Sequence, residues 1–370
     1  MADSAHLAFT LALHRAAAPD PRQNACWSPY SVASALGLAL LGAGGLTHDE
    51  LALLLLGDKA DMSRTLAKTQ LDEAARLGRV ATDDEPPVLA VTNTLWADES
   101  IHIRSSYVDL LEGVPGGSVR AAPFRKAPDE ARDLINGEVS ETTRGLINDL
   151  VPRGAIGKDT RAALVNALYL KCAWRKVFVE GATRPRAFHS PGGTVEVPTM
   201  ELNESVGYAA TGGWQVVSLP AVGGVRAVIL LPDKDLAAAE PELDAGSLAR
   251  LLDAPSSTDV RLRLPTVDVS DQFELSPPLK ALGVRTMFTD DADFGGISPD
   301  PLAVEAVLHK SVLKLDEQGL EGAAATAIMF RVTSMTLGEP VTVHVDRPFL
   351  LLIQHEASGV VYFLARVVTP

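Results

Sequence analysis

The chain has 370 residues, of which 46% are hydrophobic and 22% charged, so it can bury a large core and is not mostly disordered. Its formal net charge is −14 at pH 7. Binding to nucleic acid or to an anionic membrane requires a positively charged surface, so we expect neither as a partner. No apolar run reaches membrane-spanning length and residues 1–10 show no secretory signal, so we expect a cytoplasmic or released protein. Cys26 and Cys172 stand in apolar surroundings and are expected to be buried free thiols.

Helices are predicted mainly in the first part of the chain. Ser28 and Pro29 form a capping serine followed by a proline, and the small and apolar residues 32–41 continue the helix that they start. Thr47 to Glu50, Thr-His-Asp-Glu, has the arrangement of a capping box and predicts a second helix beginning there. Residues 129–144 have the apolar spacing of an amphipathic helix with acidic residues in its first turn.

Strands are predicted at residues 88–96 and then repeatedly from residue 162 onward. The later runs are short, branched or apolar, and separated by Gly, Pro or charge: residues 162–171, 194–200, 214–219, 225–231, 260–264, 341–345, 349–354 and 360–367. Because helices gather early and strands late without regular alternation, the pattern favours an α+β fold over a doubly wound parallel sheet. No linker divides the chain, and we expect a single domain at residues 1–370.

Several fragments resemble catalytic motifs, but each is incomplete. The segment from Gly154 to Lys158 lacks the glycine spacing and the following Ser or Thr of a phosphate-binding loop. His355-Glu356 lacks the second histidine of a zinc helix. Ser358-Gly359 lacks the glycine of a nucleophile elbow and is expected to be a hairpin turn. A triad built from distant residues stays open as an alternative, but no pattern indicates an enzyme, and we expect no cofactor and no metal.

A strand-like segment is followed by an unusual run of small residues. Residues 309–316 alternate as a strand does, and residues 317–327 are small, nearly uncharged and free of proline. The same alternation carried onward places on one face Leu320, Gly322, Ala324, Thr326, Ile328, Phe330 and Val332. This face has the side chains of a buried strand, although the run can also be exposed as a loop. A helix or linker of small residues is the alternative interpretation.

Five motifs in order make the chain resemble the serpin family over essentially its whole length. Residues 317–326, Glu-Gln-Gly-Leu-Glu-Gly-Ala-Ala-Ala-Thr, resemble the family's hinge, Glu-x-Gly-Thr-Glu-Ala-Ala-Ala-Ala-Thr. Residues 24–31 are similar to its Asn-x-x-x-Ser-Pro-x-Ser helix start, and residues 164–174 to its Asn-x-x-x-x-Lys-x-x-Trp strand. Residues 346–349 and 366–370 resemble its closing strands. A composition rich in Ala, Gly, Arg and Pro favours a prokaryotic member.

The resemblance implies a serpin fold of three β-sheets and about eight or nine helices, with an exposed reactive-centre loop at about residues 319–338. It implies an inhibitor of serine proteases that acts as a suicide substrate: the loop is cleaved, an acyl-enzyme forms, and the loop inserts into the main sheet. The implied partner is a serine protease of chymotrypsin, elastase or subtilisin type, bound covalently 1:1 by a monomer. A non-inhibitory serpin with a binding, storage or chaperone role is the alternative.

The resemblance also implies roles for particular residues. Family spacing from the hinge glutamate places the reactive bond at Thr333–Ser334, whereas counting back from Pro348 places it near Leu337. We prefer Thr333, because insertion into the sheet requires a loop segment of the family's length before the cleaved bond. The hinge is implied at Glu317, Gly319, Leu320, Glu321, Gly322, Ala323, Ala324, Ala325 and Thr326, and the bait at Ile328, Phe330, Arg331 and Val332. The shutter that controls sheet opening is implied at Ser28, Ser31, Asn166 and His309, and the breach, where the loop first enters, at Trp174.

Two hinge residues depart from the family pattern. Leu320 replaces the usual Thr, Ser or Val at the first inward-facing site, and Gly322 replaces Ala two residues later. Leucine is bulkier and must be accommodated early in insertion, and glycine adds chain entropy that insertion removes. Both substitutions are expected to slow insertion and to raise the fraction of inhibitor that is consumed as a substrate. Neither adds a charge or a proline, which would block a buried strand.

Overall fold

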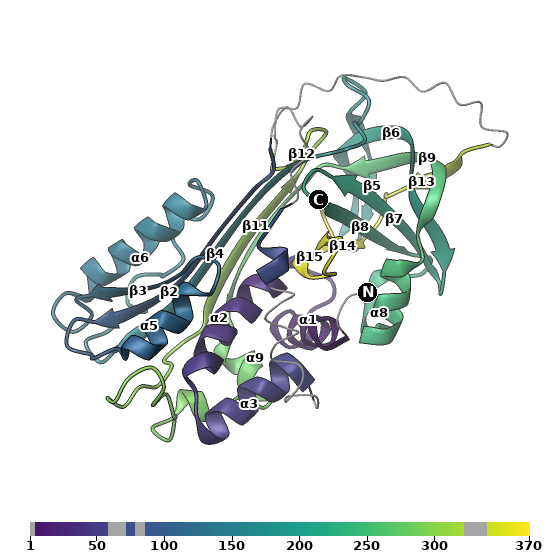
Figure 1. Ribbon diagram of the computed structural model, residues 1–370. Coiled ribbons are helices and arrows are strands. Elements are labelled where there is room, and N and C mark those ends of the chain that lie inside the picture. Colours follow the sequence, from purple (N-terminus) through teal and green to yellow (C-terminus); the bar gives the residue numbers. More distant parts are fainter. Residues whose placement is uncertain (1–3, 58–71, 78–85, 322–338) are drawn as a thin grey trace.

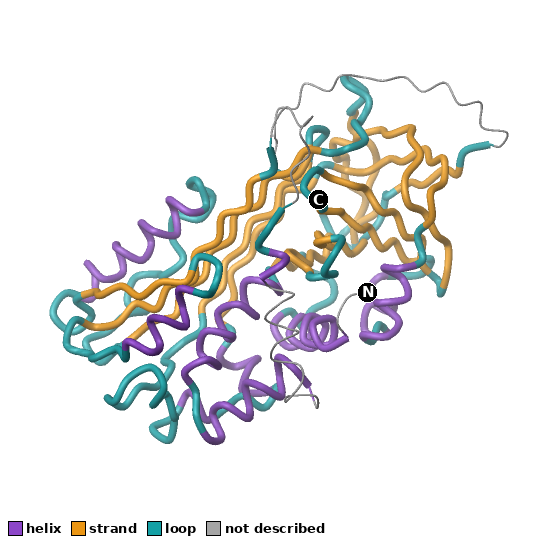
Figure 2. Tube along the Cα trace, viewed as in Figure 1, coloured by secondary structure: helices purple, strands orange, loops and turns teal. Residues whose placement is uncertain are grey.

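The computed structural model describes residues 4–57, 72–77, 86–321 and 339–370, and shows helices packed against two hydrogen-bonded sheets (Figures 1 and 2). The described helices of more than one turn are α1 (Ser4–Ala17), α2 (Pro29–Gly42), α3 (Gly45–Leu56), α5 (Ser105–Glu112), α6 (Pro128–Thr142), α8 (Ala245–Asp253) and α9 (Ser276–Ala281). Short turns of helix are α7 (Leu236–Ala239), η2 (Glu240–Glu242) and η3 (Thr286–Phe288). The predicted α+β class is confirmed. In the described part of the chain, no helix combines the length and apolarity needed to cross a membrane.

One sheet has six strands and contains a short central strand. In order, they are β10 (Val267–Glu274), β11 (Leu308–Leu315), β12 (Gly319–Leu320), β4 (Ala162–Ala173), β2 (Val88–Asp98) and β3 (Gly117–Ala122). Neighbours are antiparallel except β2 and β3. β10 pairs with the whole of β11, and β2 with almost the whole of β4, so two well-paired halves are joined through the two residues of β12.

The second sheet has nine strands and forms the other half of the molecule. Its order is β1 (Ala25–Trp27), β15 (Val361–Val367), β14 (Phe349–His355), β8 (Val225–Pro232), β7 (Trp214–Ala221), β6 (Gly193–Thr211), β9 (Ser256–Pro265) and β13 (Val341–His344), with β5 (Arg184–Ser190) beside β6. Gly359, at a φ of 74°, lies in the predicted hairpin turn between β14 and β15. Within the described residues, the strands of this second sheet form one continuous hydrogen-bonded sheet, because the 19-residue β6 pairs in turn with β5, β9 and β7.

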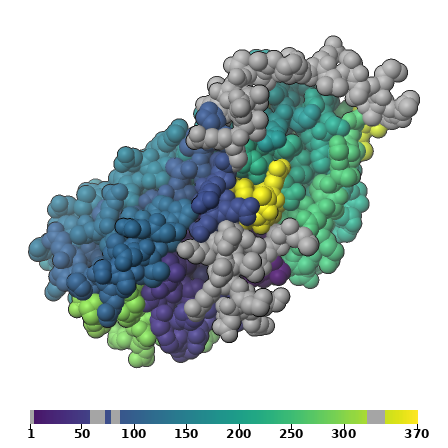
Figure 3. All heavy atoms as spheres, viewed as in Figure 1, coloured from purple at the N-terminus to yellow at the C-terminus, as the bar shows by residue number. Residues whose placement is uncertain are grey.

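The six-stranded sheet separates two apolar layers. Helix α6 lies on one face, where Ile135 and Val139 cluster with Val165 of β4. Helix α2 lies on the opposite face, where Leu36 clusters with Leu95 of β2. In the space-filling view, the blue part around β2 and α6 and the green part of the nine-stranded sheet form two adjoining halves (Figure 3). Alternate residues of β4 therefore face two different cores.

The predicted capping box at Thr47 is wrong. Helix α3 begins at Gly45, so Thr47 lies inside its first turn. The hydroxyl of Thr47 accepts the backbone N–H of Asp293 at 3.0 Å, and the Glu50 carboxylate accepts the N–H of Thr286 at 2.7 Å. Both side chains therefore bind a segment distant in sequence instead of their own helix end, a tertiary preference that no local pattern reveals.

The two cysteines are free and buried, as predicted. Burial raises the pKa of both Cys26 and Cys172 to about 12. Because the thiolate is the reactive form of cysteine, both side chains are apolar packing groups at neutral pH.

A buried ion pair joins the last strand to the first helix. Arg366 of β15 donates from Nε and Nη2 to the two carboxylate oxygens of Glu240, each at 2.6 Å. Nε2 of His14 in α1 lies 2.8 Å from Oε1 of Glu240. Because Nδ1 of His14 accepts the indole N–H of Trp27, the imidazole proton is on Nε2 and points to the carboxylate. Burial alone would raise the pKa of Glu240, but hydrogen bonds from His14 and Arg366 lower it to about 2.

Replacing Glu240 by alanine should lower the free energy of unfolding by about 3–5 kcal/mol, because Arg366 would keep a buried charge without its partner. Glu242, two residues later, is the matched control, since it is exposed and pairs with Lys234 at 2.8 Å. Glu242→Ala should cost less than about 1 kcal/mol. Guanidinium unfolding of the uncleaved protein measures both values, and equal losses would contradict this account of the pair.

Candidate functional site

The candidate site is the seam between β11 and β4. Strand β12 fills its upper end, where Leu320 pairs with Leu315 of β11 and with Cys172 of β4. Leu320 is 1% exposed and packs in one apolar cluster with both partners. The bulk of Leu320 is therefore already accommodated before any cleavage. The prediction of an exposed loop from Gly319 is corrected at its first two residues, because Gly319 and Leu320 are buried in a strand.

Gly319 is required by a close approach between chains. A Cβ atom at this position would lie 2.1 Å from the carbonyl oxygen of Cys172, so only glycine fits. Asp316 forms the turn that brings the chain back from β11, since its Oδ1 accepts two successive backbone N–H groups, the second from Gly319 at 3.2 Å. The carboxylate of Glu317 accepts the hydroxyl of Thr183. The hinge motif thus builds the return from β11 into β12.

Trp174 lies where β12 enters the sheet, at the position that the family resemblance gives to the breach. Its indole Nε1 donates to the carbonyl oxygen of Asp316 at 2.8 Å, and its backbone N–H donates to that of Gln318 at 3.1 Å. Its ring packs edge-on against Phe178, with ring centroids 6.2 Å apart. Trp174 therefore holds the turn before β12 through two hydrogen bonds.

Glu321 ends the extended run of β12. Its φ of 64° lies in the left-handed region, which a non-glycine residue adopts at a cost of about 1–3 kcal/mol. Burial raises the pKa of its carboxyl group, which hydrogen-bonds the hydroxyl of Tyr169 in β4. The Arg144 guanidinium lies 4.9 Å from the centre of the Tyr169 ring. For the strand to lengthen beyond Leu320, Glu321 must become extended and leave Tyr169.

The structure brings three of the four expected shutter residues together. The Ser28 side chain accepts the N–H of Ser31 at 3.1 Å and caps α2, as predicted. The backbone N–H of Ser28 donates to Nε2 of His309 in β11 at 3.0 Å. Because Nε2 accepts, the imidazole must be neutral with its proton on Nδ1. Burial lowers the pKa of His309 to about 4, which keeps it neutral.

The fourth residue, Asn166, lies in β4 on the other side of the seam. Its Nδ2 donates to Oδ1 of Asn93 in β2 at 2.6 Å. Its Oδ1 is buried and has no hydrogen-bond partner among the residues that the structure describes. Sequence reasoning missed Asn93, although an amide side chain in the middle of the strand predicted at residues 88–96 was a signal for it.

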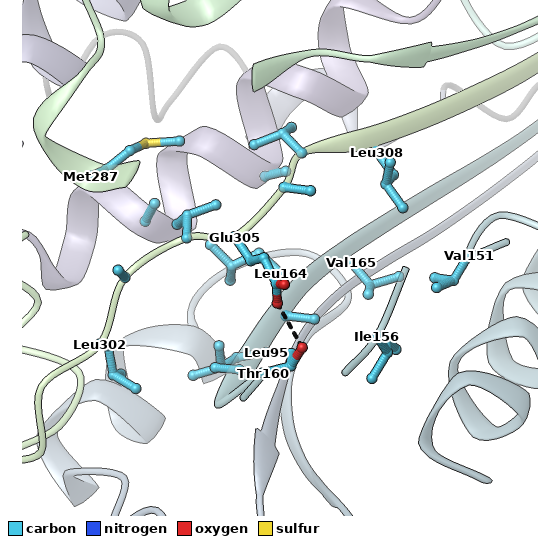
Figure 4. A pocket seen from close by; sticks show the side chains of 18 of the residues that line it. Leu95, Val151, Ile156, Thr160, Leu164, Val165, Met287, Leu302, Glu305 and Leu308 are labelled. Carbon is cyan, nitrogen blue, oxygen red and sulfur yellow. Dashed lines mark hydrogen bonds between the residues drawn. The ribbon is translucent and has the colours of Figure 1, made fainter. Parts of the chain in front are cut away.

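Below β12, the seam is not closed by backbone pairing. Within the described ranges, β11 pairs only with β10 and β12, and β4 only with β2 and β12. A cavity of about 100 Å³ lies at the foot of the seam (Figure 4). Its lining includes Leu36 from the α2 side and Val165 from the α6 side, so it connects the two layers. The Thr160 hydroxyl donates to the Glu305 carboxylate at 2.6 Å beside it.

The remaining predicted site residues lie outside the described residues, and their roles stay predictions. They are the hinge residues Gly322, Ala323, Ala324, Ala325 and Thr326, the bait residues Ile328, Phe330, Arg331 and Val332, the bond Thr333–Ser334, and Leu337.

The fold and this seam agree with the family resemblance. A family model described as "Serpin (serine protease inhibitor)" matches residues 3–370. The chain belongs to the serpin family. Ipis-1 of Ixodes persulcatus is 31% identical over 98% of this chain and 97% of its own, and Antithrombin-III of Mus musculus is 31% identical over 96% and 78%. A serpin-like protein of Thermococcus kodakarensis is 30% identical over 98% and 84%. Because its relatives include animal and archaeal proteins, the prokaryotic origin of this serpin stays a prediction.

Solved structures show the same fold at lower sequence identity. Human thyroxine-binding globulin complexed with thyroxine matches with a TM-score of 0.86 at 22% identity, covering 99% of this serpin and 98% of that chain. Uncleaved ovalbumin matches with a TM-score of 0.85 at 22% identity, covering 99% of each chain. These similarities establish the serpin fold.

Acid should weaken this serpin through His309. Its pKa is about 4 in the folded protein against an ordinary value of 6.5, so between these pH values the unfolded chain binds more protons. The free energy of unfolding therefore falls as the pH drops, and His309 contributes about 2 kcal/mol of that loss between pH 7 and pH 5. Urea unfolding of His309→Gln at the two pH values should show a loss smaller by this amount. His189→Gln, in the exposed part of β5, is the control and should keep the wild-type loss.

Proposed function

We propose that this serpin inhibits serine proteases as a suicide substrate. The observation that carries the proposal is the seam between β11 and β4, which has two residues of a central strand in place and no strand below them in the described part of the chain. A chain that continued β12 would gain backbone hydrogen bonds on both sides. The relatives with inhibitory names, such as Antithrombin-III, support the same function.

In the proposed reaction, Oγ of the protease serine attacks the carbonyl carbon of Thr333. The bond from this carbon to the nitrogen of Ser334 breaks, and the proton from the protease serine passes through the protease base to the new amino group. Thr333 is left as an ester of the protease serine. The part of the loop before Thr333 then enters the seam and carries the protease with it before water hydrolyses the ester.

The energy for insertion comes from pairing and burial. Residues 321–333 would form an extended strand between β11 and β4, and the inward set of this segment includes Ile328, Phe330 and Val332. Each of these three contributes about 1.5–3 kcal/mol on full burial. The uncleaved protein is then metastable, and it persists because of a kinetic barrier. Release of Glu321 from Tyr169 is one part of that barrier.

The bait indicates the class of protease. Thr333 is short and β-branched, and Val332 and Phe330 precede it, which fits a serine protease of elastase, chymotrypsin or subtilisin type. Cleavage after Arg331 by a trypsin-like protease would shorten the tether by two residues and favour turnover of the serpin as a substrate.

The proposal predicts a complex with one of these proteases that survives SDS, together with a separate carboxyl-terminal fragment beginning at Ser334. Gel electrophoresis and the mass of the fragment measure both products. If every protease of the panel gave only cleaved serpin and free active protease, the inhibitory function would be wrong. A non-inhibitory binding role would then be favoured, as the complex of thyroxine-binding globulin with thyroxine suggests.

Replacing Leu320 by arginine should convert the inhibitor into a substrate. The side chain at this position lies in an apolar cluster, where an unpaired charge costs several kcal/mol, so β12 would be expelled. We expect the number of serpin molecules consumed per protease molecule trapped to rise more than about tenfold. Leu320→Thr, which places the usual family residue there, is the control and should keep trapping. Equal trapping by both variants would show that insertion does not pass through this site.

A further inference from the structure

The cavity shown in Figure 4 is apolar along most of its lining. Its walls come from α2, β2, β4 and the chain before β11, and they include the buried side chains of Leu36, Leu95 and Leu302. Among the residues that line it, Glu305 is the one with a charge. Sites for small molecules have this character, because apolar walls supply affinity and a few polar groups orient the ligand.

Glu305 offers one carboxylate oxygen to a ligand. Its Oε2 accepts the hydroxyl of Thr160 at 2.6 Å, and Oγ1 of Thr160 accepts the backbone N–H of Gly157 at 3.1 Å. These two bonds hold the carboxylate beside the apolar lining. Within the described ranges, Oε1 of Glu305 has no hydrogen-bond partner and no cation pairs with the residue, which is exposed to solvent. The negative charge at this cavity is therefore not neutralised by the protein.

The size of the cavity limits the apolar part of a ligand. Its volume is about 100 Å³. An apolar cavity of about 150 Å³ holds benzene, so by proportion this one has room for about four carbon atoms.

We propose that this cavity binds a small primary amine with an apolar chain of about four carbons. The ammonium group, which is charged at neutral pH as that of lysine is, pairs with Oε1 of Glu305, and the chain lies among the leucines. The inference goes beyond the proposed function, since binding requires neither a protease nor a cleaved loop. Because the ligand would contact α2, β4 and the chain before β11 together, it would stabilise the uncleaved protein.

The test is a titration of the uncleaved protein at pH 7 with three probes of equal chain length: n-butylamine, n-butanol and butyrate. Ligand line broadening in NMR spectra measures each affinity. We expect n-butylamine to bind with a dissociation constant on the order of a few millimolar. n-Butanol should bind about fivefold more weakly, because it lacks the ion pair, and butyrate should not bind. At ten times its dissociation constant, n-butylamine should raise the unfolding temperature by about 2 °C.

Two variants test the parts of the site separately. Glu305→Gln should weaken n-butylamine to the affinity of n-butanol and leave n-butanol unchanged, which also shows that the cavity is intact. Ala155→Leu, in the turn that lines the cavity, should weaken both probes at least about tenfold by filling the space. Glu196→Gln, an exposed carboxylate of β6, is the matched control and should keep both affinities.

Three results would overturn the inference. If Glu305→Gln kept the preference for the amine, Glu305 would not select the ligand. If Ala155→Leu bound both probes as the wild type does, the ligand would lie elsewhere. If no probe bound, the cavity would not be a ligand site. None of these results bears on covalent trapping of a protease, so the proposed function stands or fails by its own test.

Discussion

The structure depends on an incomplete sheet. On its outer side, β11 is paired along its whole length and β4 along almost all of its length, but the described chain places between them only the two residues of β12. Backbone N–H and C=O groups along the seam are strong hydrogen-bonding groups, and an edge of this kind invites another strand. The burial of Leu320 shows that the seam already accepts the first inward-facing side chain of the hinge.

In addition to strand pairing, polar side-chain contacts fix the two sides of the seam in place. His309 is fixed to the start of α2 through Ser28, Asn166 is bound to Asn93, and Thr160 is bound to Glu305. Each contact uses a side chain at or beside an unpaired edge. The seam is therefore supported from the α2 side and from β2 without being closed, which leaves room for a strand.

The family motifs in the sequence predicted the fold and pointed to residues that the structure places along the seam. Ser28 is hydrogen-bonded to His309, and Trp174 to the carbonyl oxygen of Asp316. The shutter and breach roles of these residues stay predictions. Predictions failed where tertiary contacts override local ones, as at Thr47, whose hydroxyl binds Asp293. The prediction that the loop is exposed from Gly319 failed for the same reason, since Gly319 is held against the carbonyl oxygen of Cys172, where only glycine fits. No sequence motif predicts that Arg144 contacts Tyr169 or that Thr160 binds Glu305, because only the folded chain brings these residues together.

Hydrogen exchange of the amides of β4 and β11 tests most directly whether the seam receives the loop. A loop strand paired antiparallel with both β4 and β11 would protect from exchange the backbone N–H groups that face the open seam. After a single cut in the loop, exchange in residues 162–171 and 308–314 should slow strongly, while exchange in β6 and β9 stays unchanged. Equal exchange in the seam strands before and after the cut would contradict the account.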